Sequence, residues 1–138
     1  MTQADKDLLL KDLCARLPYD VKGVVISHKN MTETREEVRI IDGKLYDKFV
    51  KLQDSWHDNV TIKPYLFPLS SMTEEQKNDC PISETNLNII NSNIGYGIIE
   101  IPWRLSYLFT DWCNKNHFDY RGLIPMGLAI DATNLNIY

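Results

Sequence analysis

The segment from Lys63 to Gln76 constrains the fold more than any other part of this chain. Its two prolines, Pro64 and Pro68, each fix their own φ and disfavour helix at the preceding residue, which predicts an extended chain up to Pro68. Beyond it, two pairs have the spacing of a helix capping box: Ser71 with Glu74, and Thr73 with Gln76. The apolar residues in between are untypical of a solvated linker. The segment therefore predicts a packed strand–helix junction, with at least one buried side chain at Leu66 or Phe67.

The composition is that of one globular domain spanning residues 1–138, with 43% hydrophobic and 25% charged residues. The formal charge of −4 argues against a broad nucleic-acid surface, because phosphate binding requires a basic face. No signal-peptide pattern opens the chain, and no apolar run approaches the ~18 residues of a membrane span. The three separated cysteines indicate reduced thiols. We therefore expect a cytoplasmic protein without a membrane partner.

Three helices are predicted. The first runs from Thr2 to Leu17, with Thr2 and Asp5 as a capping box, and Asp12 is assigned to its polar surface. Its apolar stripe comprises Leu9, Leu10, Leu13, Cys14 and Leu17. A short helix from Met72 to about Cys80 follows the strand–helix junction. A third helix begins at Pro102, with an apolar stripe formed by Leu105, Leu108, Phe109, Trp112 and Cys113.

Several segments have the β-branched content or the alternation of strands. Val21 to His28 is the clearest, with Val21 and Val25 on one face and Val24 and Ile26 on the other. Further strands are predicted at residues 35–41, 59–66 and 82–93, with residues 96–101 as the hairpin partner of the last, and a loop at 29–34. Residues 43–52 fit a strand or a helix, and a helical insertion is preferred.

The segment from His117 to Asp131 is predicted to form short turns, one of them capped by Asp119. His117, Asp119, Tyr120 and Arg121 form a dense group of residue types that are common in binding sites. The preferred interpretation is structural, with an ion pair between Asp119 and Arg121 that docks the tail. A binding site is the alternative.

A second candidate binding surface combines lysines with aromatic residues, on which nucleobases can stack: Lys44, Lys48, Lys51, Lys63, Tyr46, Trp56 and Tyr65. Four aspartates between Asp42 and Asp58 cancel much of its positive charge. A solvated face of mixed charge is therefore the preferred interpretation.

Thiol and metal chemistry are disfavoured. Cys113 and His117 have an i,i+4 spacing that can chelate zinc, but a structural zinc site needs four ligands. Cys14 and Cys113 fall on apolar helical stripes, where burial makes a thiol inert, and Cys80 is expected to be better exposed. We expect no metal, no cofactor and no catalytic residue.

Four motifs carry a resemblance to known proteins: residues 13–19 (LCARLPY), 63–76 (KPYLFPLSSMTEEQ), 117–124 (HFDYRGLI) and 126–132 (MGLAIDA). They resemble a group of small proteins, without an assigned activity, that occur in gut anaerobes and their prophages. The resemblance implies a shared scaffold, a small curved sheet flanked by helices, in a mobile-element context. It implies no active-site or binding residues.

The sequence thus predicts an α+β domain. An N-terminal and a C-terminal helix flank a small, mostly antiparallel, barrel-like sheet. The preferred function is that of a non-catalytic accessory protein that binds another protein. A small-barrel nucleic-acid-binding module is the alternative, and a small hydrolase is third.

Overall fold

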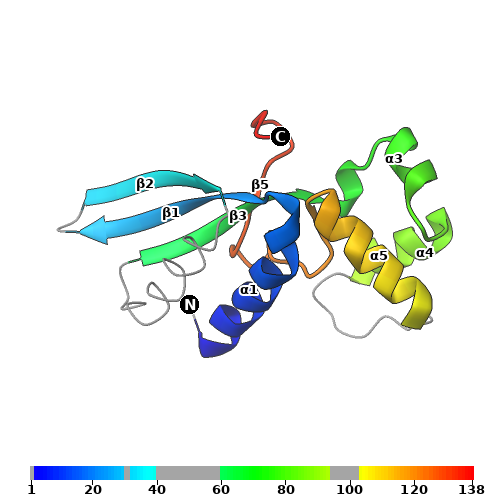
Figure 1. The fold of residues 1–138 in the computed structure, drawn as a ribbon, viewed down its shortest axis with the longest axis horizontal. Helices are drawn as coiled ribbons and strands as arrows, with labels where there is room; N and C mark the ends of the chain where they lie inside the picture. The colour runs from blue at the N-terminus through cyan, green and yellow to red at the C-terminus, as the bar shows by residue number, and fades with distance from the viewer. Residues whose placement is uncertain (1, 30–31, 40–59, 94–102) are drawn as a thin grey trace.

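The computed structural model describes residues 2–29, 32–39, 60–93 and 103–138. It is an α+β fold in which a strand hairpin extends from one end and three helices gather at the other (Figure 1). The elements are, in order, α1 (Gln3–Arg16), β1 (Lys22–Lys29), β2 (Thr32–Arg39), β3 (Val60–Pro68), α3 (Glu74–Asp79), α4 (Glu84–Asn93), α5 (Trp103–Lys115), β4 (Phe118–Asp119) and β5 (Ile130–Asp131). Short 3₁₀ turns follow α1 at Leu17–Tyr19 and β3 at Leu69–Ser71.

Helix α1 confirms the predicted capping box, in which Thr2 and Asp5 bond to each other's backbone N–H. Its buried face differs from the predicted stripe and comprises Leu9, Asp12, Leu13 and Arg16. Cys14 is exposed, so its assignment to a buried stripe is wrong. The assignment of Asp12 to the polar surface is also wrong. The predicted stripe and the buried face share Leu9 and Leu13. The face that carries Asp12 and Arg16 can be buried because these two charges pair.

The sheet is mixed and has the strand order β2-β1-β3-β4, with β5 also paired to β3. β1 pairs antiparallel with β2 and β3, whereas β4 and β5 pair parallel with the end of β3. Gly23 permits the close approach of β1 to β3, since a Cβ there would lie 2.9 Å from the Lys63 carbonyl oxygen. The barrel-like expectation is wrong, because the described strands do not close: β2 and β4 lie at opposite ends of the strand order.

The strand boundaries differ from the prediction mainly in the hairpin. β1 confirms the assignment of Val21 and Val25 to one core and of Val24 and Ile26 to another. β2 begins at Thr32, so the predicted loop at 29–34 is mostly strand. Cross-strand pairing of β1 with β2 overrides the polar composition of this segment.

The strand–helix junction is confirmed. β3 continues to Pro68, and the capping box at the start of α3 is the one formed by Thr73 and Gln76. Ser71 does not cap α3, and its hydroxyl donates to the Pro68 carbonyl instead. Leu66 is completely buried, whereas Phe67 is only partly buried.

The predicted strand at residues 82–93 is wrong, because residues 84–93 form helix α4. The Ser83 hydroxyl accepts a hydrogen bond from the Asn86 N–H at the start of this helix. Leu87 and Ile90 are buried while Ile89 is exposed, so the three-residue spacing decides which side chains are buried. The alternation of apolar and polar residues that predicted a strand is too short to be distinguished from the three-residue spacing of a helix. The proposed hairpin partner at 96–101 and the insertion at 43–52 lie outside the described residues.

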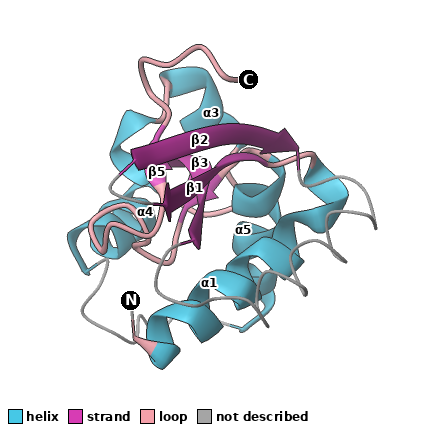
Figure 2. Ribbon diagram, turned by 90° about the vertical axis from the view of Figure 1, so that its left-hand side faces the viewer, coloured by secondary structure: helices cyan, strands magenta, loops and turns pink. Residues whose placement is uncertain are grey.

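Side chains pack into three hydrophobic clusters. One joins α1 to the sheet and to Leu123 and Leu128 of the tail, and a smaller one lies on the opposite face around Tyr65. Figure 2 shows α1 on one side of the sheet and the C-terminus on the other. The third cluster joins the strand–helix junction to α3, α4, α5 and Phe118. This cluster confirms α5 as a packed helix, with Phe109 and Cys113 buried.

Candidate functional site

A buried ion-pair network connects α1 to the C-terminal tail. Asp12 and Arg16 are both fully buried, and the Asp12 carboxylate accepts from Arg16 Nε at 2.7 Å and Nη2 at 3.1 Å. It also accepts from Arg121 Nε at 3.1 Å. Arg16 further donates to the backbone carbonyls of Cys113 and Phe118, at 3.4 and 2.8 Å. One carboxylate and one guanidinium thus connect α1, α5 and β4.

Two further residues of the predicted tail group support the same network. Asp119 caps the turn that follows it, as predicted, by accepting from the N–H groups of Leu123 and Ile124 at 2.9 and 2.8 Å. Burial raises the pKa of Asp119, against the opposing effect of these two hydrogen bonds. The Tyr120 ring lies against the Arg121 guanidinium, 4.8 Å from ring centroid to Cζ. The predicted ion pair between Asp119 and Arg121 is wrong, since Arg121 pairs with Asp12.

His117 lies in the turn that follows α5 and has a left-handed backbone conformation, with φ of 63°. Its backbone carbonyl accepts from the Phe67 N–H at 2.8 Å, and its ring stacks on Tyr138 with centroids 3.8 Å apart. Burial, with a smaller contribution from Arg16, lowers the pKa of His117 to about 4. The imidazole is therefore neutral at pH 7 and serves as a packing surface for the C-terminal residue.

The structure therefore brings His117, Asp119, Tyr120 and Arg121 together, as the sequence predicted. Their polar groups are mostly occupied by contacts within the chain, and Asp119 is only 2% exposed. This supports the structural interpretation of the group over a binding site. The other predicted binding residues, Lys44, Lys48 and Trp56, lie outside the described residues.

The thiols are distributed differently from the prediction. Cys14 is exposed, whereas Cys80 and Cys113 are buried. Burial raises the pKa of Cys80 and raises that of Cys113 well above its usual value. The expectation that Cys80 is the better exposed thiol is wrong, because the turn after α3 packs it into the core with α5. Within the described part of the chain, no three His, Cys, Asp or Glu side chains gather as metal ligands.

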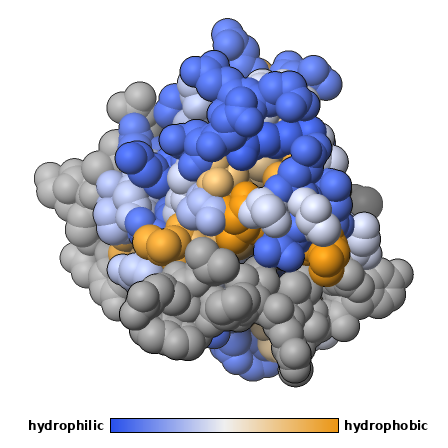
Figure 3. Space-filling model, turned by 90° about the vertical axis from the view of Figure 1, so that its right-hand side faces the viewer, coloured by the Kyte–Doolittle hydropathy of each residue, from blue (hydrophilic) through white to orange (hydrophobic). Residues whose placement is uncertain are grey.

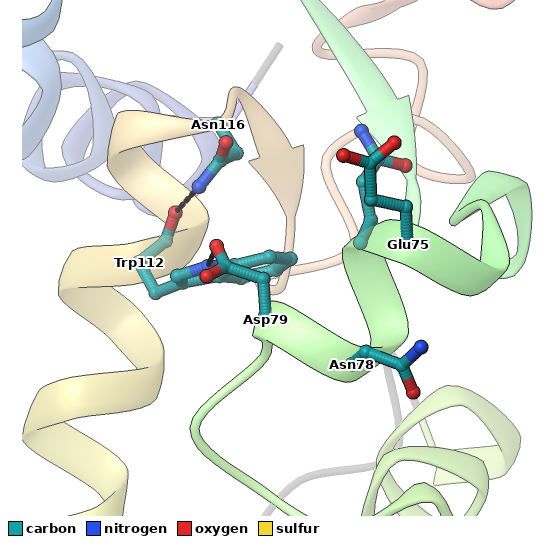
Figure 4. Close-up of a pocket in the computed structure, with 6 residues that line it drawn as sticks. Glu75, Asn78, Asp79, Trp112 and Asn116 are labelled. Atoms are coloured by element: carbon teal, nitrogen blue, oxygen red, sulfur yellow. Dashed lines mark hydrogen bonds between the residues drawn. The ribbon is translucent and has the colours of Figure 1, made fainter.

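A hollow of about 440 Å³ lies between α3 and the end of α5, and we call it the α3–α5 hollow. It is lined by Glu75, Gln76, Asn78, Asp79, Trp112 and Asn116. Figure 4 shows Glu75 and Asn116 on opposite sides, with the Trp112 ring and Asp79 below and between them. The hollow thus combines an aromatic surface, two carboxylates and side-chain amides.

Trp112 is held firmly in this hollow. Its indole N–H donates to Asp79 Oδ2 at 2.9 Å, and its ring stacks on Phe118 at a centroid distance of 5.4 Å and an interplanar angle of 6°. Its backbone carbonyl accepts from the Asn116 amide at 2.8 Å. The aromatic surface is therefore preorganised by core and polar contacts.

The negative charge of the α3–α5 hollow is not neutralised by the lysine of α3. Lys77, the nearest cation on α3, forms ion pairs with Glu74 at 3.1 Å and Glu84 at 3.8 Å. Neither of these acids lines the hollow, and none of its lining residues is basic. Glu75 and Asp79 therefore face the hollow without a cationic partner among the described residues.

Sequence reasoning missed both polar centres for identifiable reasons. Asp12 and Arg16 stand i,i+4 on the face that also carries Leu9 and Leu13, a signal for a buried pair that the hydrophobic pattern concealed. The acids of α3 were interpreted only as favourable charges at a helix N-terminus. Nothing in the sequence places Trp112 next to them, 33 positions further along the chain.

Figure 3 shows the end of the molecule formed by α3, α4 and α5. The upper part of this view is hydrophilic, and apolar side chains reach the surface across its middle. Among the described side chains of these helices, the large exposed apolar ones are Ile89, Tyr107 and Leu108.

None of the described helices is long and apolar enough to cross a membrane. The α3–α5 hollow is the strongest candidate site that the described geometry offers. The resemblance of the four sequence motifs to a group of small proteins stays a prediction. Comparison of the chain with protein-family models, with curated proteins and with solved structures finds no match.

Proposed function

We propose that this chain is a non-catalytic accessory protein of the cytoplasm, which binds another protein at the α3–α5 hollow. The motif resemblance supports a mobile or prophage-like context. The observation that carries the proposal is the preorganised Trp112 ring beside two uncompensated carboxylates. Tryptophan is among the residues that contribute most to protein interfaces, where a rigid aromatic ring supplies a large contact area at low entropic cost.

The electrostatics of the hollow favour a protein over the alternative partner, a nucleic acid. Phosphate groups require cationic or N–H donors, and the lining residues provide two carboxylates and no Lys or Arg. The third candidate, a hydrolase, lacks support from the two buried thiols, because burial raises the pKa of Cys80 and of Cys113. A thiol needs a lowered pKa to act as a nucleophile at neutral pH.

Site-specific photo-crosslinking in the native host tests this proposal. A photoreactive phenylalanine derivative replaces Asn78, an exposed residue of the hollow, and in a matched control it replaces Lys11, an exposed residue of α1. We expect irradiation to link one discrete protein to the Asn78 variant and not to the Lys11 variant. No crosslinked protein, or the same products from both positions, would refute binding at the hollow.

A further inference from the structure

We infer that the α3–α5 hollow recognises the side chain of an arginine on its partner. This inference rests on the proposed function and specifies its chemistry. Glu75 and Asp79 are four residues apart on α3, so their carboxylates project from successive turns of the same helical face. Lys77 pairs with acids outside the hollow and leaves this face negative. The charge of the hollow thus selects a cation.

The Trp112 ring selects a flat cation. Phe118 stacks on the indole, and the Asp79 carboxylate holds the indole N–H, so the ring is fixed as one wall of the hollow. A guanidinium can stack on an aromatic ring and donate in its own plane to carboxylates at the same time. A lysine ammonium makes the ion pair but lacks the planar stacking surface.

The hollow offers several acceptor oxygens that are not used within it. Asp79 uses Oδ2 for the indole, and Asn116 uses its amide N–H for the Trp112 carbonyl, which leaves Asp79 Oδ1 and Asn116 Oδ1 as acceptors. The Gln76 side-chain oxygen is not one of them, because it accepts from the Thr73 N–H in the capping box of α3. With Glu75, these oxygens match a ligand that only donates, and the guanidinium has five N–H donors and no acceptor.

The three tryptophans of the chain make a direct binding experiment possible. Trp56, Trp103 and Trp112 each give one indole signal in a ¹H–¹⁵N NMR spectrum, and Trp112→Phe identifies the Trp112 signal. The probe is N-acetyl-arginine methylamide, with the neutral citrulline analogue and the lysine analogue as comparisons. We expect the arginine probe to shift the Trp112 signal with a Kd on the order of millimolar, as for a single side chain.

Charge variants of α3 test whether the carboxylates are responsible. We expect Glu75→Gln and Asp79→Asn each to weaken the arginine probe by about two- to fivefold, the range of an exposed ion pair. Asp7→Asn is the matched control, since it removes the charge of an exposed aspartate of α1 outside the hollow and leaves Lys77 paired, and we expect unchanged binding. We also expect weaker binding at high salt.

The outcomes separate this inference from the proposed function. An unmoved Trp112 signal, an equal shift with citrulline, equal or tighter binding of the lysine analogue, or equal weakening by Asp7→Asn overturns arginine recognition. If a crosslinked partner is then still captured through Asn78, protein binding at the hollow stands with another ligand chemistry. If the arginine probe binds but no partner is captured, arginine recognition stands and the proposed function fails.

Discussion

The network around Asp12 and the α3–α5 hollow both place carboxylates beside an aromatic ring, yet they differ in charge compensation. Asp12 is fully buried and accepts hydrogen bonds from two guanidinium groups, Arg16 and Arg121. In the hollow, Asp79 accepts only the Trp112 indole N–H among the described residues, and Glu75 is exposed. The tail group had the denser sequence signal, but the hollow retains unused acceptors. A high density of charged and aromatic residues in the sequence therefore does not identify a binding site. Charged and polar groups that have no partner within the chain do.

The sharpest test of this comparison is removal of the Asp12 carboxylate. We expect Asp12→Ala to lower the free energy of unfolding by about 3–5 kcal/mol, because it leaves Arg16 buried without its counter-charge. Equilibrium urea unfolding measures the change. Asp7→Ala is the matched control, an exposed aspartate of the same helix, with an expected loss below about 0.5 kcal/mol.

A double variant separates the charge from the packing. Replacing the pair with apolar residues, Asp12→Leu with Arg16→Met, removes both buried charges together. We expect it to cost less than Asp12→Ala alone, because the fully buried Arg16 is no longer left unpaired. Arg121 loses Asp12 in both variants, and its side chain is partly exposed. A loss for Asp12→Ala no larger than that of Asp7→Ala would show that the network is not structural.

The second test uses pH and concerns His117 at the edge of the network. Its folded-state pKa of about 4 lies below the ordinary value of 6.5, so folding disfavours the protonated ring. The neutral His117 ring therefore contributes its full share of the folding stability above pH 6.5. This contribution is lost as the pH falls from 6.5 towards 4, because in this range the unfolded chain binds a proton at His117 and the folded chain does not. We expect a loss of about 1–2 kcal/mol, less than that pKa implies, since solvent screens the partly exposed ring.

His117→Asn isolates this contribution in urea unfolding at several pH values. Asparagine tolerates the positive φ of this position and does not titrate. Asp119 acts in the opposite direction, because burial raises its pKa, and it is present in both proteins. We expect the stability difference between wild type and variant to change between pH 6.5 and 4. A difference that is constant across this range would contradict a neutral, buried imidazole.

The smallest expected effect concerns the hollow itself. We expect Glu75→Gln to change the free energy of unfolding by less than about 0.5 kcal/mol, because Glu75 is exposed and has no ion-pair partner among the described residues. Thermal or urea unfolding measures this. A loss comparable to that of Asp12→Ala would make the carboxylate part of the scaffold and remove the contrast between the two regions.

The sequence alone predicted the features that depend on local chemistry. The prolines and two candidate capping boxes, of which the Thr73–Gln76 box forms, marked the strand–helix junction. The Thr2–Asp5 box began α1, and β-branched residues marked β1. Asp119 was recognised as a turn cap from its position alone. Such features are fixed by steric restriction and by hydrogen bonds within a few residues, so they can be read without the rest of the chain.

The tertiary structure decided what depends on partners far apart in sequence. Residues 84–93 are helical because Leu87 and Ile90 pack into the cluster with α5, although their short pattern also suits a strand. Asp12 is buried because Arg121, 109 positions away, completes its ion pairs. The α3–α5 hollow exists because Phe118 and Asp79 position Trp112. Burial and charge compensation are properties of the assembled chain, and therefore no local pattern of residues determines them.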